Sequence, residues 1–202
     1  RPISIPVLLG SGTTPTENYP FIITYPRGNP IIDLSDIPDL LSFARALNDA
    51  LRYAHDQHVY HCDVAPKNIV LHQKKPILID WALSITNEVG LIVGFRGTAT
   101  FASINVTRHW KESLERPYVY LGCDDFESLF YTVLYFACDK WLPWTGKENK
   151  ENLADLKFDA MITHWSNTFS VVPLQFASLL DGMHRKLFKD PNSKNINSLF
   201  DE

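Results

Sequence analysis

Hydrophobic and polar residues change their spacing several times along the 202-residue chain, and each spacing predicts a different element. Short apolar runs at residues 7–9 and 21–25, separated by a loop rich in Gly, Thr and Pro, predict two strands. Prolines and a glycine within residues 26–30 then predict a turn or hinge. We therefore expect residues 1–30 to form a strand pair followed by a hinge.

A helix is predicted next, because apolar residues recur at the spacing of one helix face. These residues are Leu40, Ala44, Leu47, Leu51 and Ala54. Ser35 and Asp36 are both suitable N-caps, which predicts a helix of about twenty residues that ends shortly before His61.

A small β-hairpin is predicted after this helix. Apolar runs at residues 69–71 and 77–79 are joined by the polar segment 72–75. Asn68 immediately precedes this hairpin and Asp80 follows it, so a functional residue is expected at each end.

The remaining part of the chain is predicted to be mainly helical. Helical patterns cover residues 125–138, 151–165 and 173–188, and the last carries an apolar stripe. Residues 84–122 show little periodicity, and a connection of this length in a compact domain is usually functional. The fold class expected from the whole pattern is α+β, mainly α-helical.

Composition narrows the class of protein. With 45% hydrophobic and 12% aromatic residues, the chain is expected to fold around one substantial core. Its net charge of -4 does not favour a nucleic-acid binder with a broad cationic surface. The apolar window 129–138 is about half the length of a membrane span. We therefore expect a core helix there, and we expect no membrane partner.

The cysteines and the first residues bear on where the protein acts. Cys62, Cys123 and Cys138 are odd in number and form no Cys-x-x-Cys pair, which favours a reduced, cytoplasmic or nuclear compartment. A protein secreted into a host cell would look the same. Arg1 is neither an initiator Met nor the start of a signal pattern, so the chain is expected to begin inside a longer gene product or after processing.

Four polar residues have the chemistry of a phosphoryl-transfer site. That reaction needs an acceptor hydroxyl held in line with phosphorus and positive charge near the phosphoryl oxygens. Asp63 would accept the hydroxyl proton, and Lys67 would offset the charge of the phosphoryl group. Asn68 and Asp80 would bind Mg²⁺ through hard oxygen ligands.

The same residues carry a resemblance to the eukaryotic protein kinase fold. His61-Cys62-Asp63 with Asn68 resembles its catalytic loop, and Asp80-Trp81-Ala82 resembles its magnesium motif. Three further segments are closest in pattern to the casein kinase one family: residues 97–105, residues 124–129 and the motif Leu142-Pro143-Trp144.

This resemblance implies a division of the chain. Residues 1–30 would be a remnant of the N-lobe strands and the hinge, and residues 31–202 would be the helical C-lobe. Within the C-lobe, the catalytic loop would be 61–68, the magnesium motif 80–82 and the activation segment 83–106. The helix at 125–138 would be its central hydrophobic helix, from which Asp125 braces the 61–63 loop.

The resemblance also implies Mg²⁺ and ATP as cofactors. Tyr25 and Arg27 lie where the hinge backbone would meet the adenine. No Gly-rich phosphate loop or strand lysine precedes them, so the N-lobe is expected to be largely missing. ATP binding would then be weak or lost, and this chain alone would have little activity.

The chain departs from the family pattern at three positions. Cys62 replaces an Arg that often pairs with a phosphorylated activation segment, so control by that phosphate is not expected. Ala82 replaces a Gly, and its Cβ disfavours positive φ. Ala65 stands where serine/threonine enzymes have a Lys, and Lys67 would take over that role. Residues 97–105 nevertheless favour Ser or Thr as the acceptor.

Several residues have simpler readings. His61 is expected to be a core or backbone-bonding residue, and Trp81 to fill the hydrophobic spine between the lobes. Ser103 and Thr98 are expected to shape the substrate platform through hydrogen bonds, with phosphorylation as the weaker alternative. The order His55, His58, His61, Cys62 matches no common zinc site.

Two functions of different classes remain. One is the C-lobe of a serine/threonine kinase that acts on a protein substrate. The other is a truncated kinase or pseudokinase that binds and regulates a protein partner. A third possibility is that a separate chain, or self-association, covers the apolar lobe face expected near Phe21, Ile23 and Trp81.

Overall fold

The fold is α+β and mainly α-helical, as the pattern predicted. The computed structural model describes residues 4–17, 19–86, 91–112, 116–146 and 149–189. The helices are α1 (Leu40–His55), α2 (Ile104–Glu112), α3 (Gly122–Ala137), α4 (Leu153–Phe158), α5 (Trp165–Phe169) and α6 (Ala177–His184). Short 3₁₀ or π turns are η1 (Leu34–Asp36), η2 (Pro66–Asn68), η3 (Trp81–Leu83), η4 (Asp159–Thr163), η5 (Leu174–Phe176) and η6 (Arg185–Lys189).

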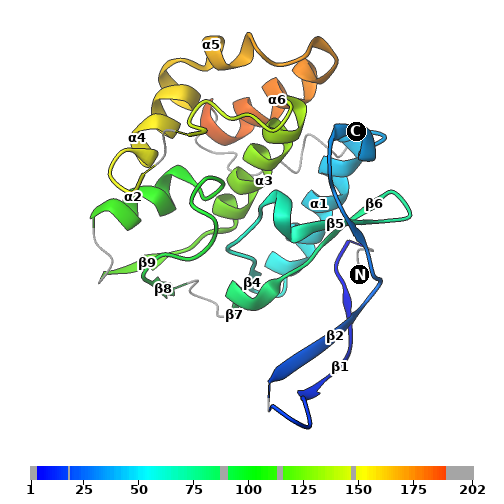
Figure 1. Ribbon diagram of the computed structural model, residues 1–202. Helices are drawn as coiled ribbons and strands as arrows, with labels where there is room; N and C mark the ends of the chain where they lie inside the picture. The colour runs from blue at the N-terminus through cyan, green and yellow to red at the C-terminus, as the bar shows by residue number, and fades with distance from the viewer. Residues whose placement is uncertain (1–3, 18, 87–90, 113–115, 147–148, 190–202) are drawn as a thin grey trace.

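Within the described residues, the strands form four small antiparallel sheets. They are β1 (Val7–Thr13), β2 (Pro20–Tyr25), β3 (Asn29–Pro30), β4 (Val59–Tyr60), β5 (Ile69–His72), β6 (Lys75–Leu78), β7 (Ile85–Thr86), β8 (Leu91–Val93) and β9 (Pro117–Val119). β1 pairs with β2, β4 with β7 and β8 with β9, whereas β3, β5 and β6 form one three-stranded sheet. Figure 1 shows the β1–β2 hairpin extending away from the helices.

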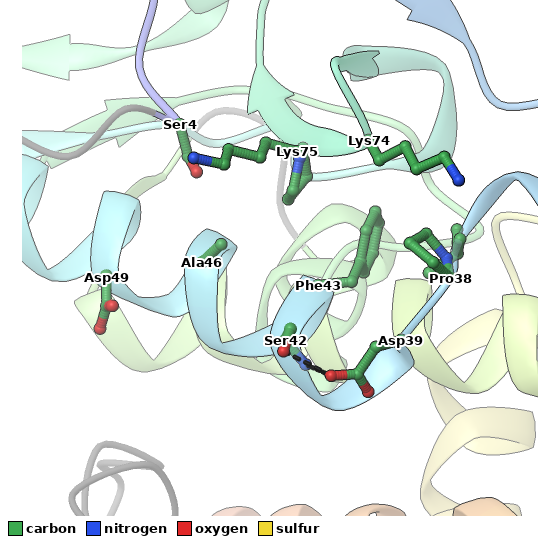
Figure 2. A pocket seen from close by; sticks show the side chains of 11 residues that line it. Ser4, Pro38, Asp39, Ser42, Phe43, Ala46, Asp49, Lys74 and Lys75 are labelled. Atoms are coloured by element: carbon green, nitrogen blue, oxygen red, sulfur yellow. Dashed lines mark hydrogen bonds between the residues drawn. The ribbon is translucent and has the colours of Figure 1, made fainter.

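Helix α1 begins later than the sequence pattern suggested. Ser35 and Asp36 belong to η1, and the N-cap of α1 is Asp39, whose carboxylate accepts hydrogen bonds from the backbone of the first turn and from the Ser42 hydroxyl (Figure 2). Pro38 explains the difference, because a proline disfavours helical backbone in the preceding residue. The helix therefore has 16 residues, and the predicted N-caps were wrong.

The β5–β6 hairpin agrees with the prediction. Its register pairs Ile69 with Leu78, and its two-residue turn places Gln73 at φ 50° and Lys74 at φ 65°. Two consecutive positive φ values are characteristic of the tight turns that match strand twist. Asn68 and Asp80 therefore lie just outside the open end of this hairpin, one before β5 and the other after β6.

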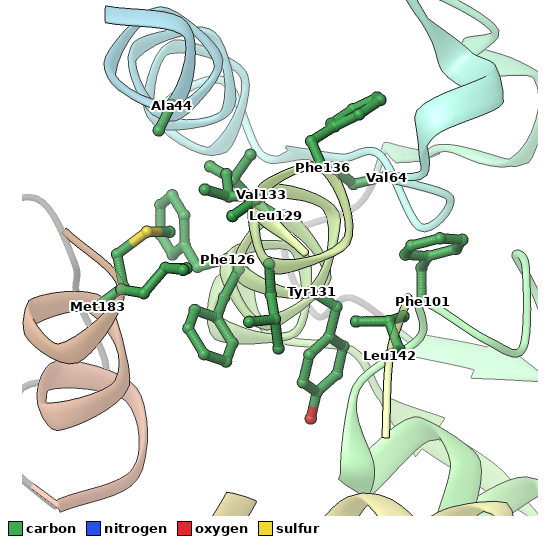
Figure 3. Close-up of a cluster of buried hydrophobic side chains, with 14 of the residues drawn as sticks. Ala44, Val64, Phe101, Phe126, Leu129, Tyr131, Val133, Phe136, Leu142 and Met183 are labelled. Carbon is green, nitrogen blue, oxygen red and sulfur yellow. The ribbon is translucent and has the colours of Figure 1, made fainter. Parts of the chain in front are cut away.

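Helix α3 is the centre of the core. Its residues are buried on all sides, as expected of a helix that is apolar around its circumference. Figure 3 shows its side chains spreading toward Ala44 of α1, Met183 of α6 and Phe101. Within the apolar window 129–138, Phe130, Tyr131 and Phe136 are buried and Tyr135 is half-buried.

The region 84–122, which shows little periodicity and was expected to be a long functional connection, contains regular structure. It contains α2 and the short strands β7, β8 and β9, with residues 87–90 and 113–115 outside the described part. The α2 sequence is largely polar, and its first backbone N–H groups are held by side chains from Ser103 and from Glu127 of α3. Tertiary contacts therefore decide this helix more than its own pattern does.

The C-terminal predictions are partly confirmed. The single helix expected over 151–165 is α4 followed by the π turn η4, with α5 starting at Trp165. The stripe over 173–188 holds: Leu180 and Met183 are buried in the core. No helix within the described residues has the length and apolar character that a membrane crossing requires.

Candidate active site

The loop at His61 and Cys62 is fixed by one buried carboxylate. Asp125 of α3 is fully buried and accepts hydrogen bonds from the backbone N–H groups of His61 at 2.8 Å and of Cys62 at 3.0 Å. The predicted brace is therefore confirmed for these two residues. Both bonds are charge-assisted, which makes them roughly twice as strong as neutral ones.

Two further donors complete the shell of Asp125. His55 Nε2 lies 2.9 Å from Oδ2, and the Tyr120 hydroxyl donates to Oδ1 at 2.9 Å. Burial alone would raise the pKa of Asp125, but hydrogen bonds from the His55 side chain and from the backbone N–H of His61 help to lower it below its ordinary value. Asp125 therefore remains ionised. The sequence did not identify His55 and Tyr120 as its partners.

The carboxylate of Asp63 is the meeting point of the predicted catalytic residues. Lys67 Nζ lies 3.2 Å from Oδ2, Asn68 Nδ2 donates to the same oxygen at 2.8 Å, and the Thr98 hydroxyl donates to Oδ1 at 2.6 Å. Asp63 is buried, whereas the Lys67 side chain is 60% exposed. The arrangement holds a carboxylate in a fixed orientation with a cation beside it. Thr98 has the hydrogen-bonding role predicted for it.

Asn68 is oriented for a second task. Its Nδ2 also donates to the backbone carbonyl of Asp63 at 2.8 Å, so both amide hydrogens point toward Asp63. Oδ1 is then the atom left to face a cation. Amide and carboxylate oxygens are the ligands that Mg²⁺ and Ca²⁺ prefer.

Asp80 lies across the hairpin end from Asn68. The Ile79 N–H donates to the Asn68 carbonyl at 2.8 Å, which brings the two backbones together. Asp80 itself has φ 62°, so the left-handed turn falls on Asp80 and not on Ala82, which lies in η3. Its exposed carboxylate lines a cavity of about 520 Å³ between α1 and the β1–β2 hairpin.

The donor set fits Mg²⁺ held together with a nucleotide. Within the described ranges, no group of three His, Cys, Asp or Glu side chains is arranged for a metal ion. A metal at Asn68 and Asp80 would therefore take its remaining ligands from phosphate and water, as Mg²⁺ commonly does.

The side chains of His61 and Trp81 pack against each other and support the loop that carries Asp63. His61 accepts from the Asp63 N–H at 3.2 Å, its Nε2 lies 3.1 Å from the Ile79 carbonyl, and its ring packs edge-on against Trp81 at 4.5 Å. Burial lowers the pKa of His61, so the ring is neutral. His61 is the backbone-bonding residue that the sequence predicted. Both of its ring nitrogens take part in these hydrogen bonds, and His55 Nε2 is bonded to Asp125.

Cys62 has an unusual backbone for an L-residue, with φ 64°. Its side chain is buried, with Sγ 3.6 Å from the Tyr60 carbonyl. Burial, with a smaller effect of the Asp125 charge, raises the pKa of the thiol strongly. Cys62 is therefore a neutral, unreactive thiol.

Tyr25 and Arg27 lie apart from this cluster. Both are exposed, the Tyr25 ring packs against His72 at 6.1 Å, and His72 Nδ1 lies 2.9 Å from the Arg27 carbonyl. Neither residue lines the cavity that contains Asp80. Their contact with adenine stays a prediction.

A buried lysine that the sequence analysis missed holds the segment after Thr98. Lys157 Nζ donates to the carbonyls of Ala99, at 2.8 Å, and Ala102, and it lies over the Tyr131 and Trp144 rings. Its side chain is completely buried. The sequence signal for this buried lysine was the position of Lys157 among the apolar residues of α4, where a solvated lysine would not fit.

The same segment is attached to α3. The Ser103 hydroxyl donates to Asp124 at 2.6 Å, and Glu127 accepts from the Ile104 N–H at 2.6 Å. Ser103 is fully buried, so its structural role is confirmed. Burial raises the pKa of Asp124 to about 6 and that of Glu127 to about 7.

Comparisons with known proteins agree with this architecture. The model of a family described as fungal protein kinase matches residues 15–138. No curated protein matches the chain. The solved structure of vaccinia related kinase 3 has a similar fold, with a TM-score of 0.63, 19% sequence identity, and coverage of 92% of this chain and 68% of that one.

Gly97 should be required where the activation segment passes the catalytic loop. It has φ 101°, and an added Cβ would lie 2.3 Å from the Cys62 carbonyl oxygen. We expect Gly97→Ala to lower the free energy of unfolding by about 3 kcal/mol or more, as measured by urea denaturation. Gly146→Ala is the matched control, because φ is 76° there and a Cβ meets open space. It should cost only about 1–2 kcal/mol, and equal losses would refute the proposed close approach.

Glu127 should make stability depend on pH. Its pKa rises from an ordinary 4.5 to about 7 on folding, so the folded state holds a proton that the unfolded state has lost between these values. Wild-type stability should therefore fall as pH rises through this window. Gln cannot ionise and can still accept from Ile104, so the stability of Glu127→Gln relative to wild type should rise from about pH 4.5 to 7 and then level off. Chemical denaturation at several pH values checks this, with exposed Glu151→Gln as the control. If the difference in stability between Glu127→Gln and wild type does not change with pH, Glu127 is not desolvated in the folded state.

Proposed function

Because the chain belongs to the fungal protein kinase family, we propose that the cluster around Asp63 transfers the γ-phosphoryl group of Mg-ATP to a hydroxyl of a protein substrate. One observation carries this proposal. The Asp63 carboxylate is contacted by Lys67, Asn68 and Thr98, on a loop that is fixed through Asp125. Phosphoryl transfer depends mainly on such positioning and on electrostatic stabilisation.

Each residue has a distinct task in this proposal. Asp63 orients the acceptor hydroxyl and accepts its proton, and Lys67 beside it offsets negative charge on the transferred group. Asn68 and Asp80 hold Mg²⁺, which with ATP supplies the phosphoryl group and neutralises part of its charge. Tyr25 and Arg27 contribute the backbone that meets the adenine.

The acceptor that we propose is Ser or Thr. The hydroxyl of Thr98 donates a hydrogen bond to Asp63. The sequence of residues 97–105 resembles the end of the activation segment in the casein kinase one family, whose members act on Ser and Thr. Cys62 stands where a phosphate-pairing Arg is common, so we do not expect regulation by phosphorylation of the activation segment.

The chain alone is proposed to bind ATP weakly and to transfer little phosphate. Residues 1–20 contain no lysine and no Gly-rich phosphate loop, so nothing in them would hold the β- and γ-phosphates.

The three cysteines are free thiols, which supports a reduced compartment such as cytoplasm or nucleus.

A second candidate is a binding module that regulates another protein. The β1–β2 hairpin exposes apolar side chains, with Leu8 61% and Ile22 73% accessible, beside the cavity that Asp80 and half-buried Trp81 line. A separate chain or a second copy could cover this face, as the sequence suggested for Ile23 and Trp81. The Phe21 side chain lies outside the described residues.

Calorimetric titration with Mg-ATP tests the nucleotide proposal. We expect weak binding that requires Mg²⁺ and that Asp80→Ala weakens at least about tenfold, or about 1.4 kcal/mol, because a metal ligand is lost. Glu151→Ala removes an exposed carboxylate elsewhere and should leave the affinity unchanged. Absence of binding at millimolar nucleotide would favour the binding module. Vigorous phosphotransfer that depends on Asp63 would contradict the expected low activity.

A further inference from the structure

The proposed phosphoryl transfer assigns no task to Lys157, although the side chain of this lysine is completely buried. We propose that Lys157, together with Trp144, is a positioning residue that sets where the Thr98 hydroxyl meets Asp63. The term positioning residue rests on the proposed function, because it takes Asp63 as the proton acceptor. The contacts that carry the inference do not depend on that function.

The backbone carbonyls after Thr98 are held by these two side chains. Lys157 Nζ donates to the carbonyls of Ala99, at 2.8 Å, and Ala102. Trp144 Nε1 donates to the Thr100 carbonyl at 3.0 Å. A carbonyl that loses its donor inside a protein is costly, so the segment is held in the conformation that satisfies all three.

The same segment forms a turn that closes on Thr98. The N–H groups of Phe101 and Ala102 both donate to the Thr98 carbonyl, at 2.9 and 3.0 Å. Lys157 therefore holds both sides of the turn, at the residue after Thr98 and at a residue that bonds back to it. The Thr98 hydroxyl donates to Asp63 at 2.6 Å, so a shift of the turn would carry this donor with it.

The support for Lys157 comes from the core of the fold. Its Nζ lies 5.1 Å from the centre of the Tyr131 ring and 5.5 Å from that of the Trp144 ring, and the two rings pack edge-on at 4.9 Å. Both rings are completely buried. Aromatic faces stabilise a desolvated cation, and closely packed rings cannot reorient freely. Lys157 is therefore held on α3, the helix that also carries Asp125.

The alternative is that Lys157 only stabilises the fold. Phe101 packs edge-on against Tyr135 at 5.3 Å, and this contact would hold the segment in place without a lysine. The two explanations differ at Asp63. If Lys157 only stabilises the fold, its loss leaves the Asp63 carboxylate unchanged in the molecules that remain folded. If it positions Thr98, its loss changes the hydrogen bond that Asp63 accepts.

Carbon-13 NMR of the Asp63 carboxyl group distinguishes these explanations, because a carboxylate signal responds to the hydrogen bonds that the group accepts. The full chain is labelled in its Asp side chains and measured at one fixed pH, and Asp63→Asn identifies the signal. Thr98→Val removes the hydroxyl and defines the shift that loss of this bond causes.

The Lys157 variants are compared with that reference shift. Lys157→Met keeps an unbranched side chain but removes the donor, and it should produce most of the shift seen in Thr98→Val. Lys157→Arg keeps a cation with several N–H donors and should restore the wild-type position. The double variant Thr98→Val, Lys157→Met should shift no further than Thr98→Val alone, because both changes act through one hydrogen bond.

Two controls separate position from stability. Lys111→Met makes the same substitution in the ion pair with Asp155, at 2.7 Å, which also joins α2 to α4. Met183→Ala opens a cavity in the core and lowers stability without removing a contact of the segment after Thr98. Both variants should leave the Asp63 signal at its wild-type position.

A further variant keeps the test decisive if Lys157→Met does not fold. Trp144→Phe keeps an aromatic ring but removes the donor to the Thr100 carbonyl, so it should move the Asp63 signal in the same direction as Thr98→Val. The proposal is overturned if folded Lys157→Met or Trp144→Phe leaves the signal in place. It is also overturned if Lys157→Arg does not restore the signal or if a control moves it as far.

Calorimetric titration of the same variants with Mg-ATP keeps this inference separate from the proposed function. Lys157→Met leaves the side chains of Asn68 and Asp80 unaltered, so it should bind Mg-ATP as wild type does. If the Asp63 signal ignores Lys157 while Mg-ATP binding is intact, only the positioning role is overturned. If wild type does not bind Mg-ATP while the signal responds to Lys157, the result counts against the proposed function alone.

Discussion

The hydrogen bonds from His61 and Cys62 to Asp125 are the constraint on which the candidate site depends. They connect a loop to the most buried helix of the fold, 64 and 63 residues away in sequence. Cys62 has a positive φ, which costs an L-residue energy, and the bonds to Asp125 offset that cost. With this stretch fixed, the residues that follow must project Asp63 and Asn68 in set directions.

Helix α3 supports the opposite side of the site as well. Ser103 and Ile104 are bound by Asp124 and Glu127 of α3, while Lys157 binds the carbonyls of Ala99 and Ala102. Thr98 thus reaches Asp63 from a segment anchored independently of the catalytic loop. Two anchored segments that meet at one carboxylate give it a fixed orientation before any substrate arrives, and the proposed phosphoryl transfer depends on positioning of this kind.

Local patterns were sufficient for the β5–β6 hairpin and for α3, because short apolar runs joined by a polar turn and a long apolar run report directly on burial. The grouping of Asp63 with Lys67 and Asn68 followed from their closeness on one loop. Helix α2 could not be predicted well, because contacts from α3 decide it. The start of α1 was placed too early, because Pro38 delays it. Lys157 and His55 were missed because their partners lie far away in sequence, and Tyr120 because the brace it completes is formed only in the fold.

Amide hydrogen exchange at His61 and Cys62 is the most direct test of the central role of Asp125. In wild type these two amides should exchange as slowly as that of Leu134 in the core of α3. An Asn side chain can accept through only one atom, so in Asp125→Asn at least one amide should exchange about tenfold or more faster relative to Leu134. Fast exchange at both amides already in wild type, or unchanged relative rates in the variant, would contradict the account.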